Sequence, residues 1–155
     1  MARPTKWRRI EYVPTSNHFI PKGGGKFLEN QLKLEEIEAI RLKDIEGLEQ
    51  SECANRMEVS RPTFQRILNE ARKKIADSII NGKAIRIGGG NFTRNICQAI
   101  CIDCNTIWNE SYENMSKIGK GEFICPQCGS SEVYCQSKGN GQFCNGNCNR
   151  RGRNL

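Results

Sequence analysis

The sequence is poor in histidine and has no long apolar segment, and each absence excludes a class of protein. His18 is the single histidine among 155 residues, and no cysteine at ligand spacing or nucleophile–base pair accompanies it. We therefore expect no enzyme. No apolar run reaches the ~20 residues of a membrane-spanning helix. A secretory signal has an apolar segment after its charged start, and the charged start of this sequence has none. These absences predict a cytoplasmic protein without a membrane partner.

Cysteine and positive charge are what the sequence has in excess. In a cytoplasmic chain, nine cysteines indicate metal ligands rather than disulfides. The net charge is +7, and residues 1–94 hold 18 Lys and Arg against 12 Asp and Glu. Residues 95–155 are nearly balanced, with 6 against 5. A basic first part suits a nucleic-acid partner, although a solubilising surface would show the same excess.

Composition divides the chain into four segments. Residues 1–31 form a basic arm rich in Pro and Gly, and residues 32–94 have apolar residues at helical spacing. Residues 95–136 carry paired cysteines and short apolar runs, of which 123–124 and 133–134 resemble strands. The Gly- and Asn-rich tail, 137–155, is expected to be disordered unless a metal orders it. The predicted fold is mainly α in the first part, followed by a small β-rich module.

Residues 47–74 have the layout of a helix-turn-helix. A short helix ends at Met57, and a turn over residues 58–60 follows. A second helix then begins at Arg61-Pro62, with Ser60 as its N-cap. Apolar residues continue at steps of three and four to about residue 80, and Gly82 is a plausible C-cap. A second helix of this kind can enter the DNA major groove.

The polar face of this second helix supplies candidate DNA contacts. Its residues outside the apolar stripe are Arg61, Thr63, Gln65, Arg66, Asn69, Arg72 and Lys73. Those near its N-terminus are expected to reach base edges, because Arg suits guanine, and Gln or Asn suits adenine. Arg72, Lys73 and Lys74 lie further along and are expected to contact phosphates. The alternative is that this face is an ordinary solvated helix surface.

The N-terminal arm supplies a second set of candidate DNA contacts, namely Arg3, Lys6, Arg8 and Arg9. Basic arms of other DNA-binding proteins lie along phosphates or in the minor groove.

Two resemblances extend this interpretation. Residues 47–74 resemble region four of the sigma-70 family, the part that reads a promoter element. Residues 1–92 resemble a small prokaryotic family of unknown function whose members are described as DNA-binding. This resemblance is carried by ARPTKWRR, LEEIEAIRLKDIEGLEQSECANRM and VSRPTFQRILNEARKKIADSIINGKAIRIGGG. It implies a helix-turn-helix and a regulatory role, without a known target. Glu58 departs from the pattern, because helix-turn-helix proteins often have Gly at this turn position.

Two C-x-x-C pairs, Cys101 with Cys104 and Cys125 with Cys128, are separated by 20 residues. Four thiolates from two such turns suit a tetrahedral Zn²⁺, and this module resembles a zinc ribbon. Asn105 and Gly129 follow the two pairs, where a left-handed backbone is often needed. Zinc is favoured over iron, which the same ligands bind. Cys97, Cys135, Cys144 and Cys148 remain as a second site or as free thiols.

The resulting hypothesis is a sequence-specific regulator of transcription that binds double-stranded DNA and contains a structural zinc module. Two alternatives stay open: a metal- or redox-responsive switch, and a protein that docks on RNA polymerase. A homodimer is a weaker expectation, since the sequence contains no dedicated coiled coil.

Overall fold

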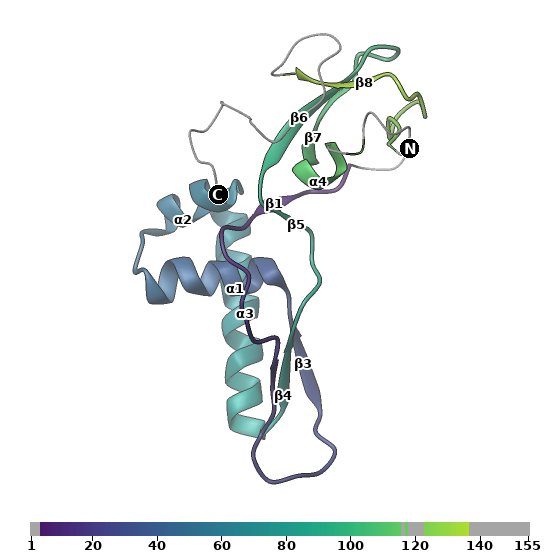
Figure 1. The fold of residues 1–155 in the computed structure, drawn as a ribbon. Helices are drawn as coiled ribbons and strands as arrows, with labels where there is room; N and C mark the ends of the chain where they lie inside the picture. Colours follow the sequence, from purple (N-terminus) through teal and green to yellow (C-terminus); the bar gives the residue numbers. More distant parts are fainter. Residues whose placement is uncertain (1–3, 116, 118–122, 137–155) are drawn as a thin grey trace. The chain divides into compact units, whose positions relative to one another are not determined.

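A computed structural model describes residues 4–115, 117 and 123–136 of the chain. Two units can be distinguished, one of residues 8–92 and one of residues 1–7 with 93–155, and Figure 1 shows their elements. Residues 8–31, predicted as a separate arm, fold with the helices of the first unit. Arg3 and the tail, including Cys144 and Cys148, lie outside the described residues.

The unit of residues 8–92 contains three α-helices and a short π-helical turn. These are α1 (Leu34–Ile40), η1 (Arg41–Ile45), α2 (Gln50–Met57) and α3 (Arg61–Asn81). Helix α1 begins with a capping interaction, since the Glu36 carboxylate accepts the Lys33 N–H at 2.9 Å. It runs directly into η1, whose Leu42 is fully buried.

Helix α3 begins and ends where its sequence predicts. The Ser60 side chain accepts the Thr63 N–H at 3.3 Å, and this satisfies one of the free donors of the first turn. Pro62 lies in that turn, where its missing N–H costs nothing. The helix ends at Gly82, which has a left-handed backbone with φ of 63°.

Short strands complete this unit. They are β1 (Arg8–Arg9), β2 (His18–Phe19), β3 (Glu29–Leu32) and β4 (Ala84–Ile87), and β5 (Phe92–Thr93) begins at the last residue of the unit. Strand β4 pairs antiparallel with β2 and parallel with β3, whereas β1 pairs with β5. In Figure 1, α3 runs beside β3 and β4. The Asn30 side chain fixes this packing, because it donates to Lys74 O and to Asp77 Oδ2 on α3.

The prediction of a mainly α first part is therefore wrong. The described chain has a mixed α/β fold, with its strands in three small sheets. The sequence of β3, ENQL, alternates too weakly to indicate a strand, and the parallel pairing with β4 joins residues that are far apart in the chain.

The second unit is built on an antiparallel sheet with the order β7-β6-β8. Its elements are β6 (Ile96–Cys101), β7 (Ile107–Ser111), the short helix α4 (Tyr112–Met115) and β8 (Val133–Cys135). Strand β8 confirms the strand expected at 133–134, whereas 123–124 form none. The buried core of this unit includes Trp108, whose ring lies 6.3 Å from that of Phe123.

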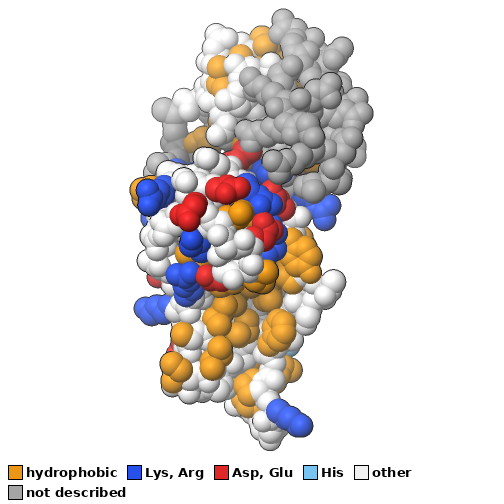
Figure 2. Space-filling view, turned by 90° about the vertical axis from the view of Figure 1, so that its left-hand side faces the viewer, with side chains coloured by type: hydrophobic (Ala, Val, Ile, Leu, Met, Phe, Trp, Pro, Cys, Tyr) orange, Lys and Arg blue, Asp and Glu red, His pale blue; other side chains and the backbone are white. Residues whose placement is uncertain are grey.

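Much apolar surface stays exposed on the unit of residues 8–92. Figure 2 shows apolar side chains gathered on the lower part of one face. The exposed large apolar residues of this unit are Tyr12, Val13, Phe19, Ile20, Leu28, Ile45, Ile79 and Ile80. Among the helices of the described residues, none combines the length and the apolar character that crossing a bilayer requires.

Candidate nucleic-acid interface and candidate metal centre

The turn between α2 and α3 is tight and contains a left-handed residue. Helix α2 ends at Met57, and Glu58 has φ of 57° and ψ of 42°. The N–H of Glu58 then reaches Asn55 O at 3.2 Å, and the N–H of Val59 reaches Ala54 O at 3.0 Å. This conformation costs a residue with a side chain roughly 1–2 kcal/mol. The turn is therefore formed in spite of its sequence at position 58.

Packing of the inner faces sets the direction of α3. Phe64 and Leu68 of α3 are fully buried against Cys53 and Met57 of α2. Burial of a side chain such as Phe64 stabilises the fold by about 1.5–3 kcal/mol. Cys53 behaves as the sequence predicts, as a small buried apolar residue, and burial raises the pKa of its thiol. Because the inner face is fixed, the opposite face of α3 points to solvent.

The predicted base-reading residues lie on this outer face. Arg61, Arg66 and Asn69 are exposed, and Gln65 is half-buried. Arg66 has no hydrogen-bond or ion-pair partner among the described residues. Thr63 instead takes part in the N-cap, since its hydroxyl oxygen lies 2.8 Å from Ser60 Oγ.

The three predicted phosphate contacts of α3 differ in their surroundings. Lys74 is half-buried and pairs with Glu36 of α1, with Nζ and Oε1 2.8 Å apart. Arg72 forms an ion pair with Asp44 of η1, with Nη2 and Oδ1 2.5 Å apart, and this carboxylate raises the pKa of Arg72. Lys73 is exposed and has no ion-pair partner in the part of the chain that the structure describes. An exposed pair such as Arg72–Asp44 contributes little to stability, so its guanidinium remains able to change partners.

The basic residues near the N-terminus are not equivalent either. Lys6 is exposed and Arg8 is half-buried. Arg9 is buried, and its Nη1 lies 3.2 Å both from Glu11 Oε1 and from Arg56 O. Arg9 therefore serves the packing of the unit, which argues against the DNA contact predicted for it.

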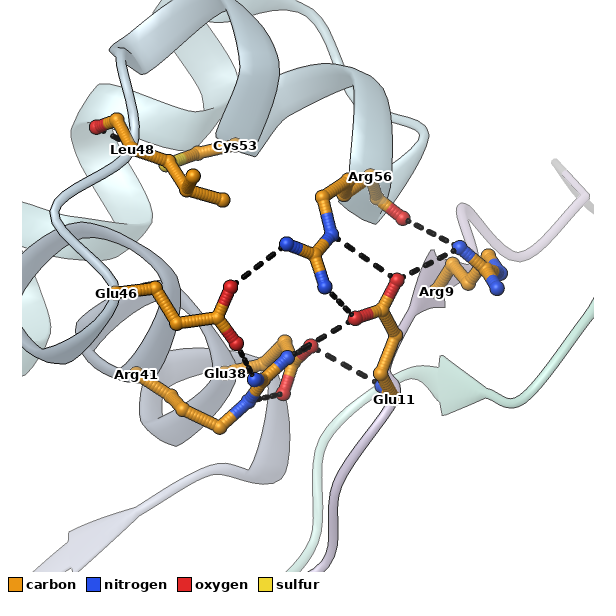
Figure 3. A network of polar contacts seen from close by, with 8 residues as sticks. All are labelled: Arg9, Glu11, Glu38, Arg41, Glu46, Leu48, Cys53 and Arg56. Carbon is orange, nitrogen blue, oxygen red and sulfur yellow. Dashed lines mark hydrogen bonds and ion pairs between the residues drawn. The ribbon is translucent and has the colours of Figure 1, made fainter. Parts of the chain in front are cut away.

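Arg9 belongs to a network of charges that no sequence pattern indicated, shown in Figure 3. Glu11 lies at its centre and accepts from Arg41 Nη2 at 3.1 Å and from Arg56 Nε at 3.2 Å. The Glu11 N–H donates to Glu38 Oε1 at 3.1 Å. Burial alone would raise the pKa of Glu11, but the hydrogen bonds and charges of the arginines, Arg56 first, outweigh burial and lower it. The network ties the N-terminal segment to α1, η1 and α2.

The four predicted metal ligands come together in the second unit. The Sγ atoms of Cys101, Cys104, Cys125 and Cys128 all lie within 4.8 Å of one another. Cys101 Sγ is 3.6 Å from Cys128 Sγ, and Cys104 Sγ is 3.7 Å from Cys125 Sγ. A metal bonded to four sulfurs at about 2.3 Å would hold them about 3.8 Å apart. The cluster therefore has the dimensions of a tetrahedral thiolate site, and the geometry does not identify the metal.

Local backbone structure positions these thiols. The first pair forms the turn between β6 and β7, and the second precedes β8. Asn105 and Gly129 have φ of 56° and 75°, which confirms the left-handed backbone predicted after each pair. Hydrogen bonding from Thr106 lowers the pKa of Cys104 to about 6, whereas burial raises the pKa of Cys101. The lowered pKa of Cys104 favours the thiolate, which is the form of cysteine that binds a metal.

Two other cysteines of this unit lie apart from the cluster. Cys97 and Cys135 are both buried in the apolar core around the sheet.

Similarity to known proteins identifies the family of the chain. A family model described as a protein of unknown function, DUF134, matches residues 1–95. The chain belongs to this family. A UPF0251 protein of Clostridium botulinum (strain Hall) is 46% identical over 155 residues, which is 99% of this chain and 94% of the relative. A UPF0251 protein of Clostridium beijerinckii is 46% identical over 157 residues and covers 100% of this chain and 99% of its own length. No solved structure matches the chain.

The family model and the relatives cover different lengths of the chain. The family model ends before Cys101, whereas the similarity to both relatives covers the part of this chain that holds the four cysteines. Membership of this family assigns no activity to the chain.

Sequence reasoning missed one residue of the α3 surface. Gln50, the first residue of α2, hydrogen-bonds to Gln65 and to Arg61. Its place at the start of the first motif helix was the available signal, because that end of the helix lies beside the outer face of α3.

Proposed function

We propose that this protein binds double-stranded DNA in a sequence-specific manner and regulates transcription, with α3 as its recognition helix. One observation carries the proposal: α3 is anchored by a fully buried inner face while its N-terminal half presents Arg61, Gln65, Arg66 and Asn69 outward. This helix follows α2 through a short turn, which is the arrangement that DNA-binding helix-turn-helix proteins use.

The chemistry of this face suits base edges. Arg66 offers two parallel N–H groups, which match the O6 and N7 acceptors of guanine. Gln65 and Asn69 offer one donor and one acceptor each, which match the N7 and N6 groups of adenine. Lys73 lies two helical turns beyond Arg66, where a cation contacts phosphate and adds affinity without sequence choice.

The first experiment is a selection of binding fragments from sheared genomic DNA at near-physiological salt. Enrichment of a defined sequence motif supports the proposal, whereas fragments retained without a motif overturn it. The salt concentration must be stated, because phosphate contacts make affinity strongly salt-dependent.

Two variants on the same exposed helix face then form a matched pair. Arg66→Ala should relax the preference at one base position by about 1–3 kcal/mol. Lys73→Ala should weaken binding to all sequences alike. It should also reduce the slope of the logarithm of the binding constant against the logarithm of the salt concentration, by the amount that about one phosphate contact contributes. A Lys73→Ala variant that changes base preference, beside an Arg66→Ala variant that does not, would show that α3 is placed wrongly on DNA.

The four-cysteine cluster is proposed to hold a structural zinc ion. Cys101, Cys104, Cys125 and Cys128 supply four thiolates, which leave no coordination position open for a substrate. The surrounding unit is small, and a bound metal would supply folding free energy that its core alone lacks.

Metal content measured by native mass spectrometry tests this assignment. The expected result is one zinc per cluster, lost in Cys104→Ser and retained in the control Cys53→Ala, whose sulfur lies in the other unit. A coloured preparation that contains iron would overturn the choice of metal. A Cys104→Ser variant with undiminished zinc would overturn the choice of ligands.

A further inference from the structure

A chain of side-chain hydrogen bonds crosses from α2 to α3 on the proposed DNA-reading face. Arg61 Nε donates to Gln50 Oε1 at 3.5 Å, and Gln50 Nε2 donates to Gln65 Oε1. Gln65 Nε2 in turn donates to Asn69 Oδ1 at 2.9 Å. Four residues from two helices thus form one connected polar row.

Arg61 sets the direction of this row. A guanidinium has donors only, so the Gln50 atom that faces it must be the carbonyl oxygen. The Gln50 amide nitrogen is then directed at Gln65, which must present its own oxygen, and each following amide is oriented in the same sense. The orientation of Gln65 is therefore determined by Gln50.

Gln65 still has a free hydrogen-bond donor and a free acceptor with which it could bind a DNA base. An amide side chain has two N–H donors and two acceptor lone pairs. The internal bonds of Gln65 use one donor, toward Asn69, and one lone pair, toward Gln50. One donor and one lone pair remain, and these are the groups that N7 and N6 of adenine require.

We infer that Gln50 is a positioning residue that holds the Gln65 amide in the orientation that selects adenine. The inference rests on the proposed DNA-binding function. A glutamine in solution must lose its side-chain freedom when it meets a base, whereas Gln65 is already held in place, and such preorganisation favours the matching base. Gln50 acts through Gln65 and needs no contact with the base.

Substitution of Gln50 tests the inference against the motif that the wild-type selection yields. Gln50→Ala and the nearly isosteric Gln50→Met should each reduce the preference for adenine at one base position by about three- to ten-fold. Because Gln50 is neutral, affinity for unrelated DNA and its salt dependence should not change. The matched control is Gln31→Ala, an exposed glutamine on β3 that should leave base preference unaltered.

A double-mutant cycle separates positioning from a general structural role. If Gln50 acts through Gln65, then Gln50→Ala should have no further effect on base preference in a Gln65→Ala background. Additive effects of the two substitutions would overturn the inference, as would an unchanged preference in both Gln50 variants. A wild-type protein that selects no motif would instead refute the proposed function, so the two failures are distinguishable.

Discussion

Replacement of Glu11 by Gln should destabilise the unit of residues 8–92 far more than its place in an N-terminal segment suggests. The carboxylate accepts from three guanidinium groups, those of Arg9, Arg41 and Arg56, while its side chain is 12% exposed. Glutamine keeps the shape of the side chain but removes its charge, so the variant isolates the electrostatic contribution.

The expected loss follows from what remains around the three arginines. Glu38 still pairs with Arg41, and Glu46 still contacts both Arg41 and Arg56. Arg9 retains the carbonyl of Arg56. Removing one partner of a fully buried ion pair costs about 3–5 kcal/mol. Since these partial substitutes exist, we expect about 2–3 kcal/mol in the free energy of unfolding.

The pH dependence gives the sharper test. The arginines lower the pKa of Glu11 in the folded protein below its usual 4.5. Its stabilisation is therefore fully present above pH 4.5 and is lost as the pH falls through the folded pKa. The difference in stability between wild type and Glu11→Gln should stay constant from neutral pH down to about pH 5 and shrink in more acid solution.

Urea denaturation followed by far-UV circular dichroism measures this difference, because α1, α2 and α3 all lie in this unit. The matched control is Glu29→Gln, which removes a carboxylate paired with the exposed Arg86 and should cost much less. Equal losses in the two variants, or a Glu11 effect that persists unchanged below pH 3, would refute the reasoning.

Three further predictions concern single positions. Glu58→Gly should raise stability by roughly 0.5 kcal/mol, because relief of the left-handed strain exceeds the entropy that glycine adds to the unfolded chain; thermal denaturation measures it. Gly90→Ala should lower the free energy of unfolding by about 1–3 kcal/mol, because a Cβ there would lie 1.9 Å from Oε2 of the buried Glu35. The same substitution in a Glu35→Ala background should cause a smaller loss of stability. Asp44→Asn should release Arg72 and steepen the salt dependence of DNA binding by about one phosphate contact, measured by fluorescence anisotropy.

Features set by neighbouring residues could be predicted from the sequence. Ser60 caps α3 and Gly82 ends it, because capping depends on residue types within one turn. The turn of each C-x-x-C pair was predictable for the same reason, since Asn105 or Gly129 follows it. The meeting of the two pairs was predictable because a tetrahedral metal site needs four thiolates.

Features set by distant residues could not be predicted. Strand β3 exists because Leu32 pairs with Ile87 and because Asn30 hydrogen-bonds to α3, and neither contact leaves a local pattern. The same holds for Glu11, whose partners lie 30 and 45 positions further along the chain. A period of two residues needs a longer strand than four residues to be visible.

The fold also decides which cations are available to a partner, and charge counting cannot do this. Arg9 and Arg72 belong to the basic excess in the sequence, yet each is paired with a carboxylate of its own chain. Arg66 and Lys73 have no such partner among the described residues. A cation that is already paired with a carboxylate of its own chain neutralises a phosphate less completely. It therefore releases fewer counterions from the DNA than an unpaired cation does. If α3 meets DNA as proposed, the measured salt slope should therefore be smaller than the net charge of +7 suggests.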